Sequence, residues 1–222
     1  MKSPLYHSPT IYETIMPLWL GKTFKKRVNK ISHLLEGKRV MEIGCGTGLN
    51  EKFLKNCNYV GLDLNEKFVN YGKARGRNVK LGDAFDVPLG GYDSILFVDI
   101  LHHIPNHEKV LKKALRTKKE VIVCEPFDKG NKNKFIEAIL NRIGEIIDSD
   151  GINPPFRWYN KNELKRFFEN CGSCIIHEAG DDLIAHYLGR VRDKLKRKLQ
   201  VRRSFSKFYR AEPLEHSKQH AP

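Results

Sequence analysis

The chain has 222 residues, of which 40% are hydrophobic and 30% are charged, and its formal net charge is +14. This length allows one sizeable core with appendages, but not two full domains. No apolar run approaches the ~20 residues that a membrane-spanning helix needs, which argues against an integral membrane protein. The first residues have only short apolar runs, interrupted by Glu13 and Pro17, and no small-residue cleavage site. They predict a mature, cytoplasmic start.

The five cysteines are odd in number and scattered along the chain. This usage favours a reducing compartment and no disulfide framework. Cys171 and Cys174, with His177 nearby, look like a fragment of a metal site, but zinc requires four ligands. The favoured interpretation is therefore a pair of buried thiols around a helix-to-strand turn, and no metal is expected.

The first 35 residues predict a helical cap. Apolar residues recur at helical spacing over 8–34, which indicates one or two amphipathic helices. After residue 36 the pattern changes to short β-rich runs that alternate with helical patterns. This alternation predicts an α/β domain with a parallel sheet over 36–188.

Within that domain seven runs predict strands, and four segments between them predict helices. The strand ranges are 39–44, 58–64, 78–83, 92–100, 119–125, 173–179 and 183–189. The helical ranges are 48–56, 65–75, 107–116 and 160–170. Only Gly180, Asp181 and Asp182 separate the last two strands, so these form an antiparallel hairpin. The predicted fold class is α/β: a Rossmann-like, doubly wound seven-stranded sheet, with five parallel strands before the closing antiparallel hairpin and helical lid elements.

One insertion, 133–158, interrupts the alternation and is predicted to lie as a lid over the carboxyl edge of the sheet, where such sheets bind ligands. Its residues 133–148 repeat apolar side chains at helical spacing. A lid formed by a helix with an apolar face favours an apolar or amphiphilic acceptor. The insertion also contains Asn-Pro-Pro-Phe at 153–156, a composition used to clamp planar nitrogen atoms. It comes long after the fourth strand, however, so a stiff turn is the better interpretation.

The strongest chemical signal is the run Glu42-x-Gly44-x-Gly46-x-Gly48, in which an apolar strand leads into three glycines and then a helix. Glycine lets the backbone turn tightly and approach a ligand closely. The following helix start offers unpaired N–H groups. A dinucleotide-binding motif would have its last glycine where Leu49 stands, so that pattern fails. Glu42 would repel a pyrophosphate but can accept from an ammonium group.

Two acids follow at the ends of the next strands. Asp63 ends the second strand, where a carboxylate can accept from both hydroxyls of a ribose. Asp83 ends the third strand, beside the flat side chain of Phe85, where it can accept from an adenine amine. The glycine run and the two acids together predict a nucleoside-containing cofactor.

The chain closely resembles the class I S-adenosylmethionine-dependent methyltransferases, in particular the broad small-molecule group related to quinone and lipid methyltransferases (types 11 and 12). The segments that carry the resemblance are VMEIGCGTG, VGLDLN, GDAFDVP, ILFVDILHHI, VIVCEP and RWYNKNELKRFFENCG. They cover about residues 36–188 in the family's order. The resemblance implies that S-adenosylmethionine is the cofactor.

The resemblance assigns the methionine end of the cofactor to the first and fourth strands. It implies that the three glycines line the methionine part and that Glu42 faces the amino group through water. Val98 and Asp99 would border the methionine and the transferred methyl group. Tyr12 stands where relatives often place a tyrosine against the cofactor.

At the adenosine end, the resemblance implies that Asp63 holds the ribose and that Leu64 lies against the adenine. Asp83 and the backbone N–H of Ala84 would bind the adenine edge.

Transfer from a sulfonium depends chiefly on positioning the acceptor and excluding water. A base is needed only if the acceptor is protonated at neutral pH. His102, His103 and Glu125 are candidates at the carboxyl edge, and His suits the task by its pKa. His103 is the candidate base, and packing or lining the pocket is its alternative role.

Residues 189–222 predict a basic C-terminal tail. Residues 189–210 hold ten Lys and Arg against one Asp, with apolar and aromatic residues among them. The segment Arg190–Arg210 could lie on an anionic membrane surface. It could equally bind RNA phosphates, or be a solvated extension.

Three functions remain open from the sequence. The first is a methyltransferase acting on a small, apolar or lipid-like or quinone-like acceptor, cytoplasmic or peripheral to a membrane. The second is an RNA (tRNA) methyltransferase that uses the basic tail to hold phosphates. The third is a non-catalytic, cofactor-binding partner subunit.

Overall fold

The computed structural model describes residues 7–128 and 159–189, all of which belong to the unit Met1–Gly189. The predicted helix at 133–148, the Asn-Pro-Pro-Phe turn and the basic tail lie outside the described residues. No helix in the described part combines the length and apolarity that a membrane crossing requires.

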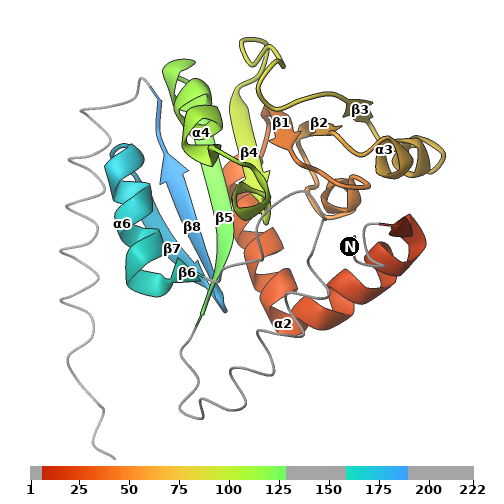
Figure 1. Cartoon of the computed structure of the whole chain (residues 1–222), viewed down its shortest axis with the longest axis horizontal. Helices are drawn as coiled ribbons and strands as arrows, with labels where there is room; N and C mark the ends of the chain where they lie inside the picture. Colours follow the sequence, from red (N-terminus) through yellow and green to blue (C-terminus); the bar gives the residue numbers. More distant parts are fainter. Residues whose placement is uncertain (1–6, 129–158, 190–222) are drawn as a thin grey trace, which may run out of the picture. The chain divides into compact units, whose positions relative to one another are not determined.

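Seven strands form one mixed sheet in the order β3-β2-β1-β4-β5-β8-β7 (Figure 1). Their bounds are Arg39–Ile43 (β1), Asn58–Asp63 (β2), Val79–Leu81 (β3), Ser94–Val98 (β4), Glu120–Asp128 (β5), Ile175–Ala179 (β7) and Asp182–Tyr187 (β8). Strands β1 to β5 pair in parallel, and β8 runs antiparallel to both β5 and β7. The predicted fold class is therefore confirmed. A two-residue strand, β6 (Tyr159–Asn160), pairs with the end of β5 and was not predicted.

In the described part of the chain, four helices of at least two turns connect or cover the strands. They are α2 (Pro9–Leu35), α3 (Glu66–Lys73), α4 (His107–Arg116) and α6 (Lys161–Cys171). Helix α2 is one continuous helix that contains Pro17 and begins where the Ser8 side chain accepts from the N–H of Ile11. Asn160 caps α6 with a reciprocal bond to Glu163.

The helix predicted at 48–56 is much shorter than expected. Only the 3₁₀ turn η1 (Leu49–Lys52) forms there. Gly48 before it and Asn56 after it both have a left-handed backbone, with φ of 75° and 67°. An α-helix cannot extend through a left-handed residue, so these two positions leave room for little more than a turn. A second such turn, η2 (Leu101–His103), follows β4.

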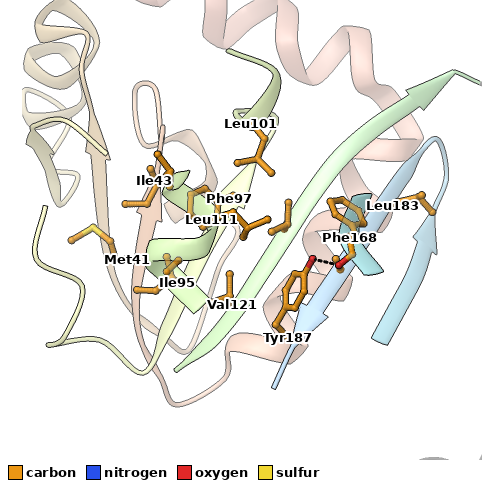
Figure 2. Close-up of a cluster of buried hydrophobic side chains, with 14 of the residues drawn as sticks. Met41, Ile43, Ile95, Phe97, Leu101, Leu111, Val121, Phe168, Leu183 and Tyr187 are labelled. Carbon is orange, nitrogen blue, oxygen red and sulfur yellow. Dashed lines mark hydrogen bonds between the residues drawn. The ribbon is translucent and has the colours of Figure 1, made fainter. Parts of the chain in front are cut away.

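The sheet is buried on both faces, which explains the nearly continuous apolar runs of its strands. In β4, Ile95 and Phe97 belong to the cluster that includes side chains of α4 and α6 (Figure 2). Leu96 and Val98 belong to the opposite cluster, which contains the inner face of α2. Each such side chain stabilises the fold by about 1.5–3 kcal/mol when fully buried. The two layers fix the sheet, and with it the loops at its carboxyl edge.

Candidate active site

A cavity of about 520 Å³ opens at the carboxyl ends of β1, β2 and β4. This is the edge at which open α/β sheets bind ligands. Six of the nine predicted cofactor residues line the cavity: Gly44, Gly46, Asp63, Leu64, Asp83 and Ala84. Its wall also includes Tyr12, Phe68, Phe85, Asp99, Ile100 and His103. The structure thus brings together residues from five separate segments of the chain.

The glycine loop gives the cavity its floor because it has no side chains there. Gly44 and Gly46 both have left-handed backbones, with φ of 72° and 58°. A Cβ atom on Gly44 would lie 2.1 Å from Cγ1 of Ile100. A Cβ on Gly46 would lie 3.3 Å from the Tyr12 hydroxyl. A side chain at either position would therefore collide with the opposite wall or narrow the space between loop and wall.

Asp63 connects this loop to the end of β2. Its Oδ2 accepts from the N–H of Gly46 at 2.6 Å, and its Oδ1 accepts from the N–H of Asn65 at 2.8 Å. Burial raises the pKa of Asp63, although these backbone donors act against the shift. Each carboxylate oxygen keeps a further lone pair for a ligand hydroxyl.

The part of the cavity wall that Leu64, Asp83 and Phe85 form is apolar except for the carboxylate of Asp83, and its apolar side chains are exposed. Leu64 is 66% exposed and Phe85 is 40% exposed. Between them Asp83 accepts from the N–H of Phe85 through one oxygen, at 2.8 Å. Two exposed apolar side chains beside an acceptor form a slot that suits a flat base with an exocyclic amine.

Three predicted residues lie away from the cavity wall. Gly48 packs against Val79, and Val98 belongs to the core beneath α2. Glu42 is 1% exposed and accepts from Tyr59 and, at 2.7 Å, from Asn50. Burial raises the pKa of Glu42 to about 7.

Asp99 does line the cavity, and a residue that sequence reasoning did not single out holds it in place. Its backbone is left-handed, with φ of 50°. Its Oδ2 lies 2.5 Å from Nη1 of Arg27, which comes from α2 and is buried. Arg27 also lies 3.6 Å from Asp182 at the start of β8. Burial raises the pKa of Asp99, and Arg27 opposes that shift.

The two histidines after β4 have different surroundings. Nδ1 of His102 pairs at 2.6 Å with Glu125, which is fully buried on β5. Glu125 also accepts from the N–H groups of Ile100 and Leu101. Burial favours a raised pKa for Glu125, but His102 and the two donors outweigh it, so its pKa is below the ordinary value. His103 instead lines the cavity.

Helix α2 also contributes, through Glu13, a contact that has no local sequence signal. Tyr12 lines the cavity and packs on Phe68 with 5.1 Å between ring centroids. The neighbouring Glu13 accepts from Thr47 at 2.6 Å and from Arg77. These bonds tie the first part of α2 to the glycine loop. Ion pairs between distant segments have no local sequence pattern, so only the structure reveals them.

The cysteines form no part of this site. All five are free thiols, and Cys171 and Cys174 are half-buried around the turn from α6 to β7. Burial raises the pKa of Cys174 to about 11. Among residues 7–128 and 159–189, no group of three or more His, Cys, Asp or Glu side chains is arranged to hold a metal ion.

Residues 41–121 match the model of a known protein family, which is described as a methyltransferase domain. A fatty-acid O-methyltransferase of Mycolicibacterium smegmatis is 35% identical over 37% of this chain and 34% of its own length. A tRNA (uracil(54)-C(5))-methyltransferase of Pyrococcus horikoshii is 30% identical over 55% of this chain and 32% of its own length. The matched part of the chain thus spans about a third of each of these two relatives.

A demethylmenaquinone methyltransferase of Staphylococcus aureus is 26% identical over 68% of this chain and 74% of its own length. Among solved structures, a SAM-dependent methyltransferase from Thermotoga maritima, described as a possible histamine N-methyltransferase, has a TM-score of 0.59 at 20% identity. It covers 80% of this chain and 97% of that one. At this identity the likeness shows the fold.

The strand order, the cavity and the family match show a methyltransferase domain with the Rossmann-like fold of the S-adenosylmethionine-dependent methyltransferases. The methyltransferase domain spans at least residues 41–121, and S-adenosylmethionine is its cofactor. The residues present fit that group, because the side-chain-free glycine floor, Asp63 and the slot around Asp83 lie in one cavity.

Proposed function

We propose that this enzyme methylates a small, neutral and largely apolar acceptor that enters the cavity beside the cofactor. The observation that carries the proposal is the charge of the cavity wall. Among the described residues, its side chains include four carboxylates, Asp63, Glu66, Asp83 and Asp99, and no Lys or Arg. Such a wall repels carboxylate and phosphate groups, so an anionic head group would have to stay outside it.

The far part of the wall supports an apolar acceptor. Ile100, Ile104 and Pro105 line it beyond the glycine loop, and Phe85 presents an exposed ring. Pockets of this composition bind ligands by burying apolar area and use a few polar groups to set orientation. The name of the demethylmenaquinone relative also points to an apolar acceptor.

When bound, S-adenosylmethionine supplies a methyl group that is already activated, so the protein's task is positioning. We assign Asp63 to the ribose hydroxyls, Asp83 with the backbone N–H of Ala84 to the adenine edge, and Gly44 and Gly46 to the methionine part. Tyr12 covers the glycine loop and keeps water from it.

His103 is the side chain we assign to the acceptor's proton. It lines the cavity, and its ring packs against that of His102, whose Nδ1 pairs with Glu125. A neutral imidazole at the wall can take a proton from an acceptor hydroxyl as the new bond forms. Glu125 acts on this residue indirectly, because it holds the backbone of η2 through two N–H groups.

A second candidate, an RNA acceptor, is favoured by the relative that methylates tRNA uracil and by the basic segment Arg190–Arg210. The acidic cavity wall counts against it, since backbone phosphates would need cationic contacts outside the cavity.

Transfer of labelled methyl from S-adenosylmethionine to lipid, small-molecule and RNA fractions tests the proposal. Label should appear in the apolar small-molecule or lipid fraction and should be lost in Asp63→Asn. Label found only in RNA would overturn the assignment. No transfer to any fraction, with S-adenosylhomocysteine still bound, would instead support a cofactor-binding subunit.

His103→Gln separates the role of the imidazole from that of the cavity. If His103 takes the acceptor's proton, kcat should fall at least tenfold while the affinity for S-adenosylhomocysteine stays within about twofold. If kcat and the affinity for S-adenosylhomocysteine fall by the same factor, His103 only shapes the cavity wall and does not take the proton.

A further inference from the structure

The outward face of α2 differs sharply from its inner face. Phe24, Val28, Ile31 and Leu35 are buried against the sheet. Four lysines on the other side, Lys22, Lys25, Lys26 and Lys30, are exposed. At 100° per residue the lysines lie opposite the buried stripe, so they form one continuous basic strip.

Among the described residues, no acidic side chain pairs with this strip. The only acid in α2 is Glu13, and its carboxylate is bound to Arg77 and Thr47. Arg27, the remaining cation of the helix, points inward to Asp99. Within the described residues, none of the four lysines forms an ion pair. The exposed charge of α2 is therefore entirely positive.

Toward the start of α2 the same outward stripe becomes apolar. Ile11 and Ile15 are 40% and 36% exposed, and helical geometry places them in line with Lys22. They flank Tyr12, whose side chain lines the cavity. The basic strip and the cavity are thus connected by two exposed aliphatic side chains on a single helix.

We propose that this face of α2, with Ile11 and Ile15 at one end and the four lysines along it, docks on the surface of an anionic lipid bilayer. The inference deepens the proposed function and rests on it, because an apolar acceptor concentrates in the bilayer. Lysines attract an anionic leaflet, and aliphatic side chains enter its interfacial region. Docking by this face places Tyr12 and the cavity wall next to the membrane.

A bilayer fits this face better than a nucleic acid does. Proteins that bind single strands combine basic residues with aromatic rings on which bases stack. Among the side chains that the structure describes along this stripe, the exposed large ones are Ile11 and Ile15.

Co-sedimentation of the full chain with vesicles tests the proposal, comparing phosphatidylcholine alone with phosphatidylcholine mixed with phosphatidylglycerol. The test variant replaces Lys22, Lys25, Lys26 and Lys30 by Gln. The control replaces four exposed lysines on other helices, Lys67, Lys73, Lys109 and Lys165, by Gln. Both variants have the same net charge and keep the basic tail, so their difference reports the position of the charges.

The α2 variant should bind phosphatidylglycerol vesicles at least tenfold more weakly than the unchanged chain, and the control should stay within about threefold. Ile11→Ser with Ile15→Ser should weaken binding further without changing its salt dependence. Equal losses in the two lysine variants would overturn the proposal. So would an α2 variant that loses tRNA binding but keeps vesicle binding.

Binding of S-adenosylhomocysteine to both lysine variants should match the unchanged chain, since none of these lysines lines the cavity. Methyl transfer to a detergent-dispersed acceptor separates the two proposals. If the unchanged chain methylates the dispersed acceptor but does not bind the vesicles, the proposed docking surface is wrong and the proposed function stands. If the unchanged chain binds the vesicles through α2 but methylates no apolar acceptor, the proposed function is wrong and the docking surface stands.

Discussion

Glu42 in β1 and Glu125 in β5 are both almost fully buried, on strands separated only by β4. Their surroundings differ. Glu42 has two neutral donors, Tyr59 and Asn50, and burial raises its pKa to about 7. Glu125 has the His102 ring and two backbone N–H groups, and its pKa lies below the ordinary value despite burial.

The comparison shows that burial alone does not decide whether a carboxylate keeps its charge. Neutral hydroxyl and amide donors only partly offset the loss of water around Glu42. A histidine and two aligned N–H groups more than offset it around Glu125. The anionic residue is also the one that holds η2, the turn that carries His103 to the cavity.

The largest effect is expected from Glu125→Ala. The change leaves His102 and two backbone donors without their acceptor in the interior, so unfolding free energy should fall by about 3–5 kcal/mol. Affinity for S-adenosylhomocysteine should fall as well, because η2 is no longer fixed. Urea unfolding and calorimetric titration measure the two quantities.

Glu120→Ala provides the matched control at the other end of β5. Glu120 pairs with His186 at 2.6 Å and with Lys38 at 2.8 Å, but it does not line the cavity. Glu120→Ala should lower the free energy of unfolding, while the affinity for S-adenosylhomocysteine stays within about twofold. A similar loss of affinity in both variants would mean that Glu125 has no special link to the site.

Glu42→Gln should change the pH dependence of stability. The ordinary pKa of 4.5 applies to the unfolded chain, and burial raises the folded value to about 7. Between these values only the folded state holds the proton, so stability falls as pH rises from about 4.5 to 7. The loss should be on the order of 3 kcal/mol.

Thermal unfolding of both chains from pH 5 to pH 8 checks this slope. Glu42→Gln should flatten it and be relatively more stable at pH 8. Glu125 contributes in the opposite sense, because a depressed pKa stabilises the fold above the unfolded value and is lost as pH falls. A slope unaffected by Glu42→Gln would refute the assignment of Glu42 as a protonated group near neutrality.

Asp63→Asn should have a smaller effect on stability and a direct effect on binding. The amide keeps one acceptor oxygen, so one of the bonds to Gly46 and Asn65 survives. Loss of a charged acceptor for the ribose costs about 1.5–3 kcal/mol, or roughly tenfold to a hundredfold in the affinity for S-adenosylhomocysteine. Unchanged affinity would place the ribose elsewhere.

Glu13→Gln should have the smallest effect. Its ion pair with Arg77 is mostly buried, with side chains 4% and 12% exposed. The amide oxygen of Gln can still accept from Arg77 or Thr47, which limits the loss to about 1–2 kcal/mol. Hydrogen exchange should show faster opening of the first turns of α2 and little change in the sheet. Protection lost equally throughout the domain would mean that α2 does not open on its own.

Much of this fold is predictable because its signals are local. Strands buried on both faces read as apolar runs, and a three-residue connection requires a hairpin. Within the site, Gly44, Gly46, Asp63 and Asp83 follow strand ends, so topology brings them to one edge. Left-handed residues such as Asn56, which shorten the segment after Gly48, leave only a weak mark on the sequence.

The contacts that sequence reasoning missed join distant segments. Arg27 reads as one cation among the lysines of α2, and only packing reveals that it turns inward to Asp99. Glu42 carries the right type of side chain for an ammonium partner. Its register in β1, however, directs it to Tyr59 and Asn50 instead of the cavity. Pairings between separate elements have no periodicity from which to predict them.

The pairing of Arg27 with Asp182 also bears on how the chain folds. Arg27 precedes the sheet in the chain, whereas Asp182 begins β8, which follows every other strand of the described sheet. Until β8 is in place, Arg27 has Asp99 but lacks its second carboxylate partner, so α2 is not fully anchored. We therefore expect a chain without the hairpin to hold α2, and with it Tyr12, less firmly against the cavity.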